Sequence, residues 1–339
     1  MPLDAKRPVA PRATAYLFPI RKTDLEINLQ VCPRRLARQL RGETCLVSMS
    51  ARDSFVDIQC DPLANARTAI VLLHGLCSTP DELRPVESSL RSLGYALHPL
   101  SIEGYSFDAQ ADVQRATRSV DWIDAIERKV DALRATHQHV LLVGISAGAS
   151  LALGAAIRCG ERIDGMVLMS TALRLDGWSI PRWHFLLPLA LYTPLGRFWK
   201  YRERSPYGVK NERVRAWIER ELRTRRISSA GSSVIGIGHL REHDRLVRHV
   251  RRQITQVRCG QVLALHARED EVASIANLGI LSRGLRSATL RCVILDNSFH
   301  MITIDNDRQQ VISETVRFAA TIARARPEDA TRPTTFPET

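Results

Sequence analysis

The sequence has little that would support a disulfide-stabilised, secreted or membrane-spanning protein. Aromatic residues make up 6% of the 339 residues, and the seven cysteines are odd in number, scattered and never spaced as CxxC. This spacing indicates neither a disulfide framework nor a zinc ribbon. The nearest candidate for a membrane span, 183–196, is broken by Pro188 and Pro194 and is shorter than the roughly 18 residues required. The N-terminal residues have no apolar core of signal-peptide length, so we expect a cytoplasmic protein with free thiols.

Lysine is also scarce, since it supplies only 5 of the 48 basic residues. The net charge of +12 lies in one segment, 171–260, which holds 19 Lys and Arg against 7 Asp and Glu, so the rest of the chain sums to zero. No recognised motif or aromatic base-stacking surface accompanies this charge, and nucleic-acid binding is therefore disfavoured. The charge fits better with contact to an anionic lipid surface or an acidic acyl carrier.

Outside that segment, short β-branched runs alternate with helical patterns. Strands are predicted at 68–73, 95–100, 140–145, 163–169, 261–266 and 288–295, with a possible edge strand at 55–58. Such alternation is typical of an α/β protein with a mostly parallel sheet flanked by helices. The predicted organisation is an N-terminal, partly disordered extension at 1–48, a core formed by 49–170 and 261–325, an inserted segment at 171–260 and a flexible tail at 326–339.

The stretch LLVGISAGASLALGAA, residues 141–156, contains the pattern Gly-x-Ser-x-Gly centred on Ser146. Alone this pattern is weak evidence, because small residues also permit a tightly packed turn from strand to helix. A nucleophilic serine requires a strand, a sharp turn with glycines where backbones meet, and a helix. All three are predicted here, which favours Ser146 as a nucleophile.

An acid and a histidine follow Ser146 in the order that this arrangement requires. LALHARED ends a predicted strand at Asp270, and VILDNSFH ends the next at His300. Neutral His300 would accept the serine proton while the carboxylate fixes its tautomer; Glu269 and Asp296 are alternative acids. The ordinary histidine pKa of about 6.5 predicts that kcat/KM rises between roughly pH 6 and 8.

Acyl transfer also needs two backbone N–H groups to bind the oxyanion. We expect one from Ala147, directly after the serine, and one from Leu76 in the loop after the 68–73 strand. In the same loop, His74 is interpreted as structuring the backbone, and Cys77 as lining the pocket entrance without reacting.

Three stretches make residues 53–323 resemble the α/β-hydrolases, specifically compact bacterial carboxylesterases and monoacylglycerol-lipase-like enzymes. They are VLLHGLCSTPDEL, VGISAG, and the pair HARED and SFHMITID, in which Asp305 follows the Ser-x-His pattern. The resemblance implies an α/β-hydrolase fold with an inserted helical cap, and a triad of Ser146, Asp270 and His300. The long insert and the N-terminal extension depart from the family's pattern. The resemblance therefore does not define the substrate or the lid.

The predicted activity is hydrolysis of carboxylic esters of hydrophobic acyl groups through an acyl-enzyme, with no metal or organic cofactor. Two alternatives stay open. One is a thioesterase or acyltransferase that uses the same triad, and the other is a catalytically silent α/β-hydrolase that serves as a binding protein.

The first third of the insert holds three of the five tryptophans. We predict that some of its apolar side chains roof an acyl pocket. The candidates are Trp178, Trp183, Phe185 and Leu186. Further on, His239-Leu240-Arg241-Glu242-His243 matches H-x-x-E-H, a zinc-protease signature. It lacks an evident third ligand and lies in an arginine-rich segment, so a solvated helix is predicted there instead of a zinc site.

Overall fold

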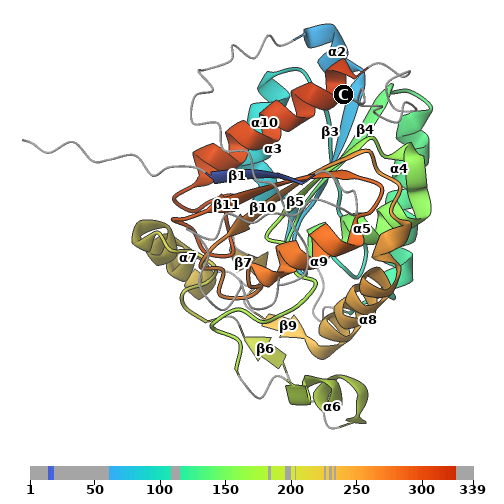
Figure 1. The fold of residues 1–339 in the computed structure, drawn as a ribbon. Coiled ribbons are helices and arrows are strands. Elements are labelled where there is room, and N and C mark those ends of the chain that lie inside the picture. The colour runs from blue at the N-terminus through green and yellow to red at the C-terminus, as the bar shows by residue number, and fades with distance from the viewer. Residues whose placement is uncertain are drawn as a thin grey trace, which may run out of the picture.

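The computed structural model describes residues 14–18 as a strand and, from 61 to 325, all residues except 108–114, 182–184, 195–199, 203, 225–226, 229–230 and 233. A seven-stranded sheet in the order β1-β11-β10-β5-β4-β2-β3 forms the centre (Figure 1). Its strands are β1 (Thr14–Phe18), β2 (Thr68–Leu73), β3 (Ala96–Pro99), β4 (His139–Ile145), β5 (Gly165–Met169), β10 (Gln261–Ala267) and β11 (Thr289–Leu295). Every neighbouring pair is parallel except β1 with β11. The predicted mostly parallel sheet is confirmed.

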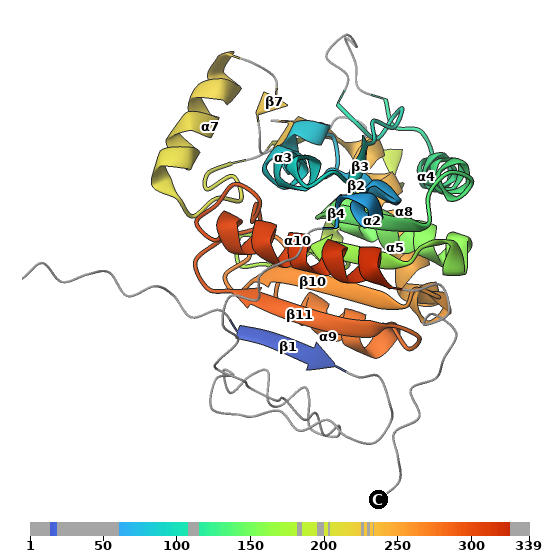
Figure 2. The same ribbon diagram turned by 90° about the horizontal axis from the view of Figure 1, so that it is seen from above.

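Strand β1 comes from the N-terminal extension. It pairs antiparallel with β11, with Thr14 opposite Ile294 and Phe18 opposite Leu290, and lies at the edge of the sheet (Figure 2). Its sequence, TAYLF, is rich in the β-branched and aromatic residues that strands favour. Part of the segment interpreted as a loose extension therefore joins the sheet. The edge strand expected at 55–58 lies outside the described residues.

Helices cover both faces of the sheet (Figure 1). The core helices are α3 (Arg84–Ser92), α4 (Ser119–Arg134), α5 (Ala147–Cys159), α9 (Ala276–Gly284) and α10 (Arg308–Arg324), and a short helix, α2 (Pro62–Ala66), precedes β2. One apolar cluster joins α4, α5 and α9 to the sheet, and a second joins α3 and α10 to the opposite face. Strand β4 is buried throughout and contributes Val140 and Leu142 to the first cluster and Leu141 and Val143 to the second, as the alternation of side chains along a strand requires.

In the described part of the insert between β5 and β10, three α-helices accompany two small two-stranded antiparallel sheets, β6 with β9 and β7 with β8. They are α6 (Leu187–Tyr192), β6 (Lys200–Arg202), α7 (Glu212–Thr224), β7 (Ile227–Ser228), β8 (Gly231–Ser232), β9 (Val234–Gly236) and α8 (Ile237–Gln253). α6 and α7 lie apart from the two helical layers (Figure 1). α8 instead packs against α4 and α5, where its Leu246 and Val250 are buried in the first apolar cluster. In the part of the chain that the structure describes, no helix has the length and apolar character needed to cross a bilayer.

Candidate active site

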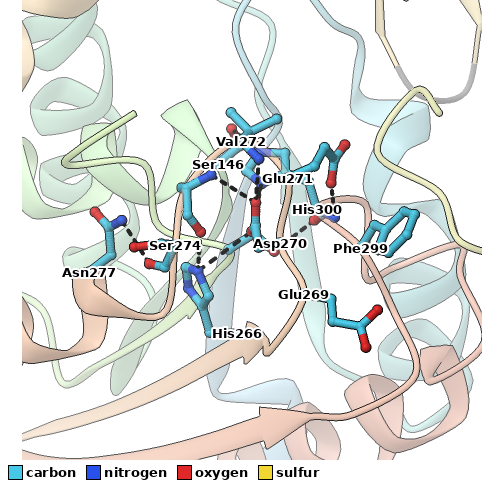
Figure 3. Close-up of polar contacts among 12 residues, drawn as sticks. Ser146, His266, Glu269, Asp270, Glu271, Val272, Ser274, Asn277, Phe299 and His300 are labelled. Atoms are coloured by element: carbon cyan, nitrogen blue, oxygen red, sulfur yellow. Dashed lines mark hydrogen bonds and ion pairs between the residues drawn. The ribbon is translucent and has the colours of Figure 1, made fainter. Parts of the chain in front are cut away.

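Ser146, Asp270 and His300 meet at the carboxyl ends of β4, β10 and β11 (Figure 3). Nε2 of His300 lies 2.8 Å from Ser146 Oγ, and Nδ1 lies 2.8 Å from Asp270 Oδ2. A carboxylate can only accept, so the ring proton of neutral His300 is on Nδ1. Nε2 is then the free base that faces the serine hydroxyl.

The backbone at Ser146 is held in a sharp turn between β4 and α5. Its φ of 55° and ψ of −117° are unusual for a residue with a side chain. A Cβ on Gly144 would lie 2.5 Å from the carbonyl oxygen of Gly148, and one on Gly148 would lie 2.2 Å from that of Leu73. Both glycines are therefore required by close backbone packing, and the turn presents Ser146 Oγ to His300.

Of the three acids considered, only Asp270 reaches the histidine. Its Oδ1 accepts the N–H groups of Val272 and Ala273 at 2.9 and 2.8 Å, which holds the carboxylate in place. Glu269 pairs with Lys210 at 2.8 Å, and its side chain is 52% exposed. Asp296 pairs with Arg268 at 2.6 Å, and its side chain is 37% exposed. The geometry therefore favours Asp270 among the three candidates, and its role as the catalytic acid stays a prediction.

Two buried groups that the sequence pattern did not reveal hold the backbone of His300. Glu271 Oε2 accepts the His300 N–H at 3.0 Å, and the Ser170 hydroxyl donates to the His300 carbonyl oxygen at 2.7 Å. Glu271 directly follows the predicted acid, and Ser170 directly follows β5. Their positions at strand ends were the available signal, but nothing in the sequence indicates which way their side chains point.

Asp305 connects the histidine loop to the insert. Its buried carboxylate accepts the N–H of Phe299 at 2.9 Å, that of Lys210 at 2.7 Å and that of Asn211 at 2.9 Å. One side chain thus fixes both the residue before His300 and the segment that leads into α7.

The charges around His300 change its acid–base behaviour. Burial alone would lower its pKa, but the charge and hydrogen bond of Asp270, together with the charges of Glu271 and Glu82, raise it to about 9. Burial tends to raise the pKa of Asp270, yet contact with His300 holds it below its usual range. The pH range over which His300 becomes a neutral base therefore moves above the 6 to 8 expected from an unperturbed histidine.

Of the two predicted oxyanion donors, Leu76 lies in the loop after β2 and Ala147 is the first residue of α5, and these two segments pack together. Gly148, one residue after Ala147, approaches the backbone of Leu73 and His74 so closely that no side chain would fit. Within the described residues, neither the Leu76 N–H nor the Ala147 N–H donates to a protein acceptor. The role of both N–H groups as oxyanion donors stays a prediction.

The predicted substrate-binding residues fall into two groups. The Trp178 indole N–H donates to the Glu269 carbonyl at 2.9 Å, and its ring packs edge-on against Phe299 with centroids 5.5 Å apart. Trp178 therefore lies beside the residue that precedes His300. Phe185 and Leu186 are 70% and 45% exposed, and Trp183 lies outside the described residues. The roles of all four in substrate binding stay predictions.

The H-x-x-E-H stretch is not on a solvated face, and that expectation is wrong. His239, Glu242 and His243 are all buried, because α8 packs against α4 and α5. Glu242 accepts the Ser119 N–H at the start of α4 at 2.9 Å and pairs with Arg245 at 2.5 Å. The Glu242 side chain of this motif thus links α8 to the start of α4. Among the described residues, no group of three His, Cys, Asp or Glu side chains could hold a metal ion.

A mostly parallel sheet with a serine on a strained turn, followed in the chain by an acid and a histidine, defines the α/β-hydrolases. Residues 64–307 match the Hydrolase_4 family, described as serine aminopeptidase, S33, and the chain belongs to this family. It is an α/β-hydrolase of the carboxylesterase and monoacylglycerol-lipase-like type.

Individual relatives agree with this assignment. The thermostable monoacylglycerol lipase of Bacillus sp. (strain H-257) is 24% identical over 256 residues, which cover 76% of this chain and 92% of the relative. A structure reported for the metagenome-derived lipolytic enzymes LipS and LipT aligns with a TM-score of 0.62 at 19% identity, over 76% of this chain and 95% of the other. A soluble variant of monoglyceride lipase from Saccharomyces cerevisiae aligns with a TM-score of 0.62 at 14% identity, over 77% and 88%. These structures share the fold.

Proposed function

We propose that the protein is a serine esterase that hydrolyses carboxylic esters of hydrophobic acyl groups, with monoacylglycerols as the leading substrate class. The observation that carries the proposal is the hydrogen-bonded chain from Asp270 through His300 to Ser146 Oγ. The similarity to a bacterial monoacylglycerol lipase supports an ester substrate with an apolar acyl chain.

The proposed reaction has two half-reactions. Ser146 Oγ attacks the ester carbonyl carbon as its proton passes to His300 Nε2, and the carbonyl oxygen becomes an anion bound by the N–H groups of Leu76 and Ala147. The C–O bond to the alcohol then breaks, and His300 protonates the leaving oxygen. Water attacks the acyl-enzyme with His300 again as base, releasing the carboxylic acid and restoring Ser146. Asp270 stabilises the imidazolium in both steps.

A substrate panel tests the proposal and separates it from the alternatives. We expect p-nitrophenyl esters and monoacylglycerols of graded chain length to be hydrolysed, and acyl-CoA thioesters of the same acyl chains to react at least tenfold more slowly, as measured by kcat/KM. Preference for the thioesters would indicate a thioesterase, and acyl transfer to an added alcohol in preference to water would indicate an acyltransferase. No turnover of any member would support a binding protein.

We further propose that the insert contacts an anionic lipid surface. The apolar side chains of Phe185, Leu189 and Tyr192 are 70%, 60% and 40% exposed on or beside α6. Arg245 and Arg248 of α8 lie over the Tyr192 ring, 5.9 and 4.8 Å from its centroid. An exposed apolar cluster next to arginines has the composition of a site that inserts into an anionic interface.

Replacing Leu189 and Tyr192 together with serine should separate surface binding from chemistry. Activity on a p-nitrophenyl short-chain ester should stay within twofold of wild type, while activity on monoacylglycerol in anionic vesicles should fall at least tenfold. The matched control is Leu63→Ser, because Leu63 is 71% exposed on α2, at the opposite end of the molecule from α6 (Figure 1). The surface proposal fails if vesicle activity is unchanged, or if the Leu63 variant loses as much.

The cysteines support the expected cytoplasmic location, which remains a proposal. Among the described residues, the thiols of Cys77, Cys159 and Cys259 are buried and form no disulfide. Burial raises the pKa of Cys77 to about 12, so its thiol stays protonated and unreactive, in keeping with a structural position in the Leu76 loop.

A further inference from the structure

The direction of the Leu76 N–H is set by the peptide group between Gly75 and Leu76. In a trans peptide the C=O and the following N–H point in opposite directions. The Gly75 carbonyl oxygen lies 2.7 Å from His74 Nδ1 and accepts the Ser78 N–H at 3.2 Å. Since the burial of His74 lowers its pKa to about 4, the ring is neutral and donates from Nδ1. These bonds fix the direction of the Gly75 carbonyl, and the Leu76 N–H therefore points to the opposite side of the same peptide group.

The other side of Gly75 is held by a carboxyl group. The Gly75 N–H donates to Glu82 Oε2 at 2.5 Å, and Glu82 is 3% exposed. A Cβ on Gly75 would lie 3.1 Å from Glu82 Oε1, so the carboxyl lies directly against the glycine backbone. Burying a carboxyl group costs free energy unless it is hydrogen-bonded, and the bond to Gly75 offsets part of that cost.

Glu82 is itself anchored to the histidine loop. It lies in the short 3-10 helix η1 (Pro80–Leu83), and its carbonyl oxygen accepts the hydroxyl of Thr303 at 3.0 Å. Thr303 is three residues beyond His300. The side chain of Glu82 is thus hydrogen-bonded to the loop that carries Leu76, the predicted oxyanion donor. Its backbone carbonyl is hydrogen-bonded to the loop that carries His300, the predicted base.

We propose that Glu82 is a positioning residue for the oxyanion hole, which fixes the Leu76 N–H in register with Ser146 and His300 by accepting the Gly75 N–H. The inference rests on the proposed function and adds a group outside the triad and the two donors. Its effect is exerted only when negative charge develops on the substrate oxygen, so it acts on kcat more than on KM.

The test compares Glu82→Leu and Glu82→Gln on p-nitrophenyl butyrate. Deleting an oxyanion donor costs about 10²- to 10³-fold in kcat. Misaligning one donor in Glu82→Leu should cost about 10- to 100-fold, with KM changed less than twofold. Glu82→Gln keeps a carbonyl acceptor for the Gly75 N–H and should recover kcat to within about fivefold of wild type. The affinity for phenylboronic acid, whose adduct with serine places an oxygen in the oxyanion hole, should fall in Glu82→Leu in parallel with kcat.

The matched control is Glu314→Leu, because Glu314 of α10 is also buried but pairs with Arg291 of β11 and Arg317 of α10. It should lower Tm and leave kcat and boronate affinity unchanged. Wild-type kcat in Glu82→Leu would overturn the positioning role. So would a loss of kcat in Glu82→Gln as large as that in Glu82→Leu. If Glu82→Leu does not fold, Glu82→Gln still decides, since a loss above 30-fold there contradicts the proposal. Absence of ester hydrolysis in the wild type would instead refute the proposed function.

Discussion

Ser146→Ala is expected to lower kcat/KM for ester hydrolysis by about 10⁴- to 10⁶-fold, since triad residues act as a unit and removal of the nucleophile alone removes most of their effect. Alanine lacks the oxygen that lies 2.8 Å from His300 Nε2 but can occupy the same backbone turn. The variant should therefore fold normally and retain only the residual catalysis that comes from the oxyanion donors and substrate binding.

A fluorophosphonate probe provides the direct measurement. Wild type should gain one probe mass located on Ser146, and Ser146→Ala should gain none. Ser150→Ala is the control, because Ser150 is fully buried one turn further along α5 and donates to the Ala172 carbonyl at 3.1 Å; this variant should label like wild type. Labelling that persists in Ser146→Ala would assign the nucleophile to another residue.

The parallel sheet could be predicted from sequence because its strands are buried on both faces and read as short β-branched runs. β2 and β4 are buried along their whole length, and each is followed by a helical pattern. The same reasoning placed Ser146, Asp270 and His300 beyond strand carboxyl ends, where the parallel sheet brings them together.

Strand β1 could not be found in this way. It is antiparallel, lies at an edge, and its pairing with β11 joins residues separated by almost the entire core. No local periodicity encodes such a contact. The burial of His239 and His243 was missed for a related reason. The charged residues next to these histidines favoured a helix surrounded by solvent. In the structure, α8 instead packs one of its faces against α4 and α5.

The sequence pattern also does not reveal the carboxyl groups that change the pKa of His300. Glu82 resembles an ordinary acid in the first turn of a helix, and Glu271 an ordinary neighbour of Asp270. In the structure, both carboxylates are buried near His300, and burial raises the pKa of Glu82 to about 7. Their charges add to that of Asp270, which is the largest of the influences that raise the His300 pKa, so an unperturbed histidine pKa is a poor guide here.

Asp270→Asn is expected to lower kcat/KM by about 10³- to 10⁴-fold. The Val272 and Ala273 N–H groups bind Oδ1 of Asp270, so in the variant the amide oxygen takes that position. The amide NH₂ then faces His300 Nδ1, in the place of the oxygen now 2.8 Å away. Because this NH₂ is a donor, it favours the tautomer with the proton on Nε2, which cannot accept the proton of Ser146.

The pH profile shows whether this loss comes from the acid that faces His300. The base acts only when neutral, so kcat/KM of wild type should rise with pH and reach half its plateau near the raised His300 pKa of about 9. Removing the Asp270 charge lowers that pKa, and the residual activity of Asp270→Asn should reach its plateau at lower pH. Glu271→Gln is the control, because it removes a nearby charge but leaves the Nδ1 contact intact. Its profile should also shift to lower pH, with a loss in the plateau of kcat/KM of less than about tenfold. An Asp270→Asn enzyme within tenfold of wild type would move the acid role to Glu269 or Asp296.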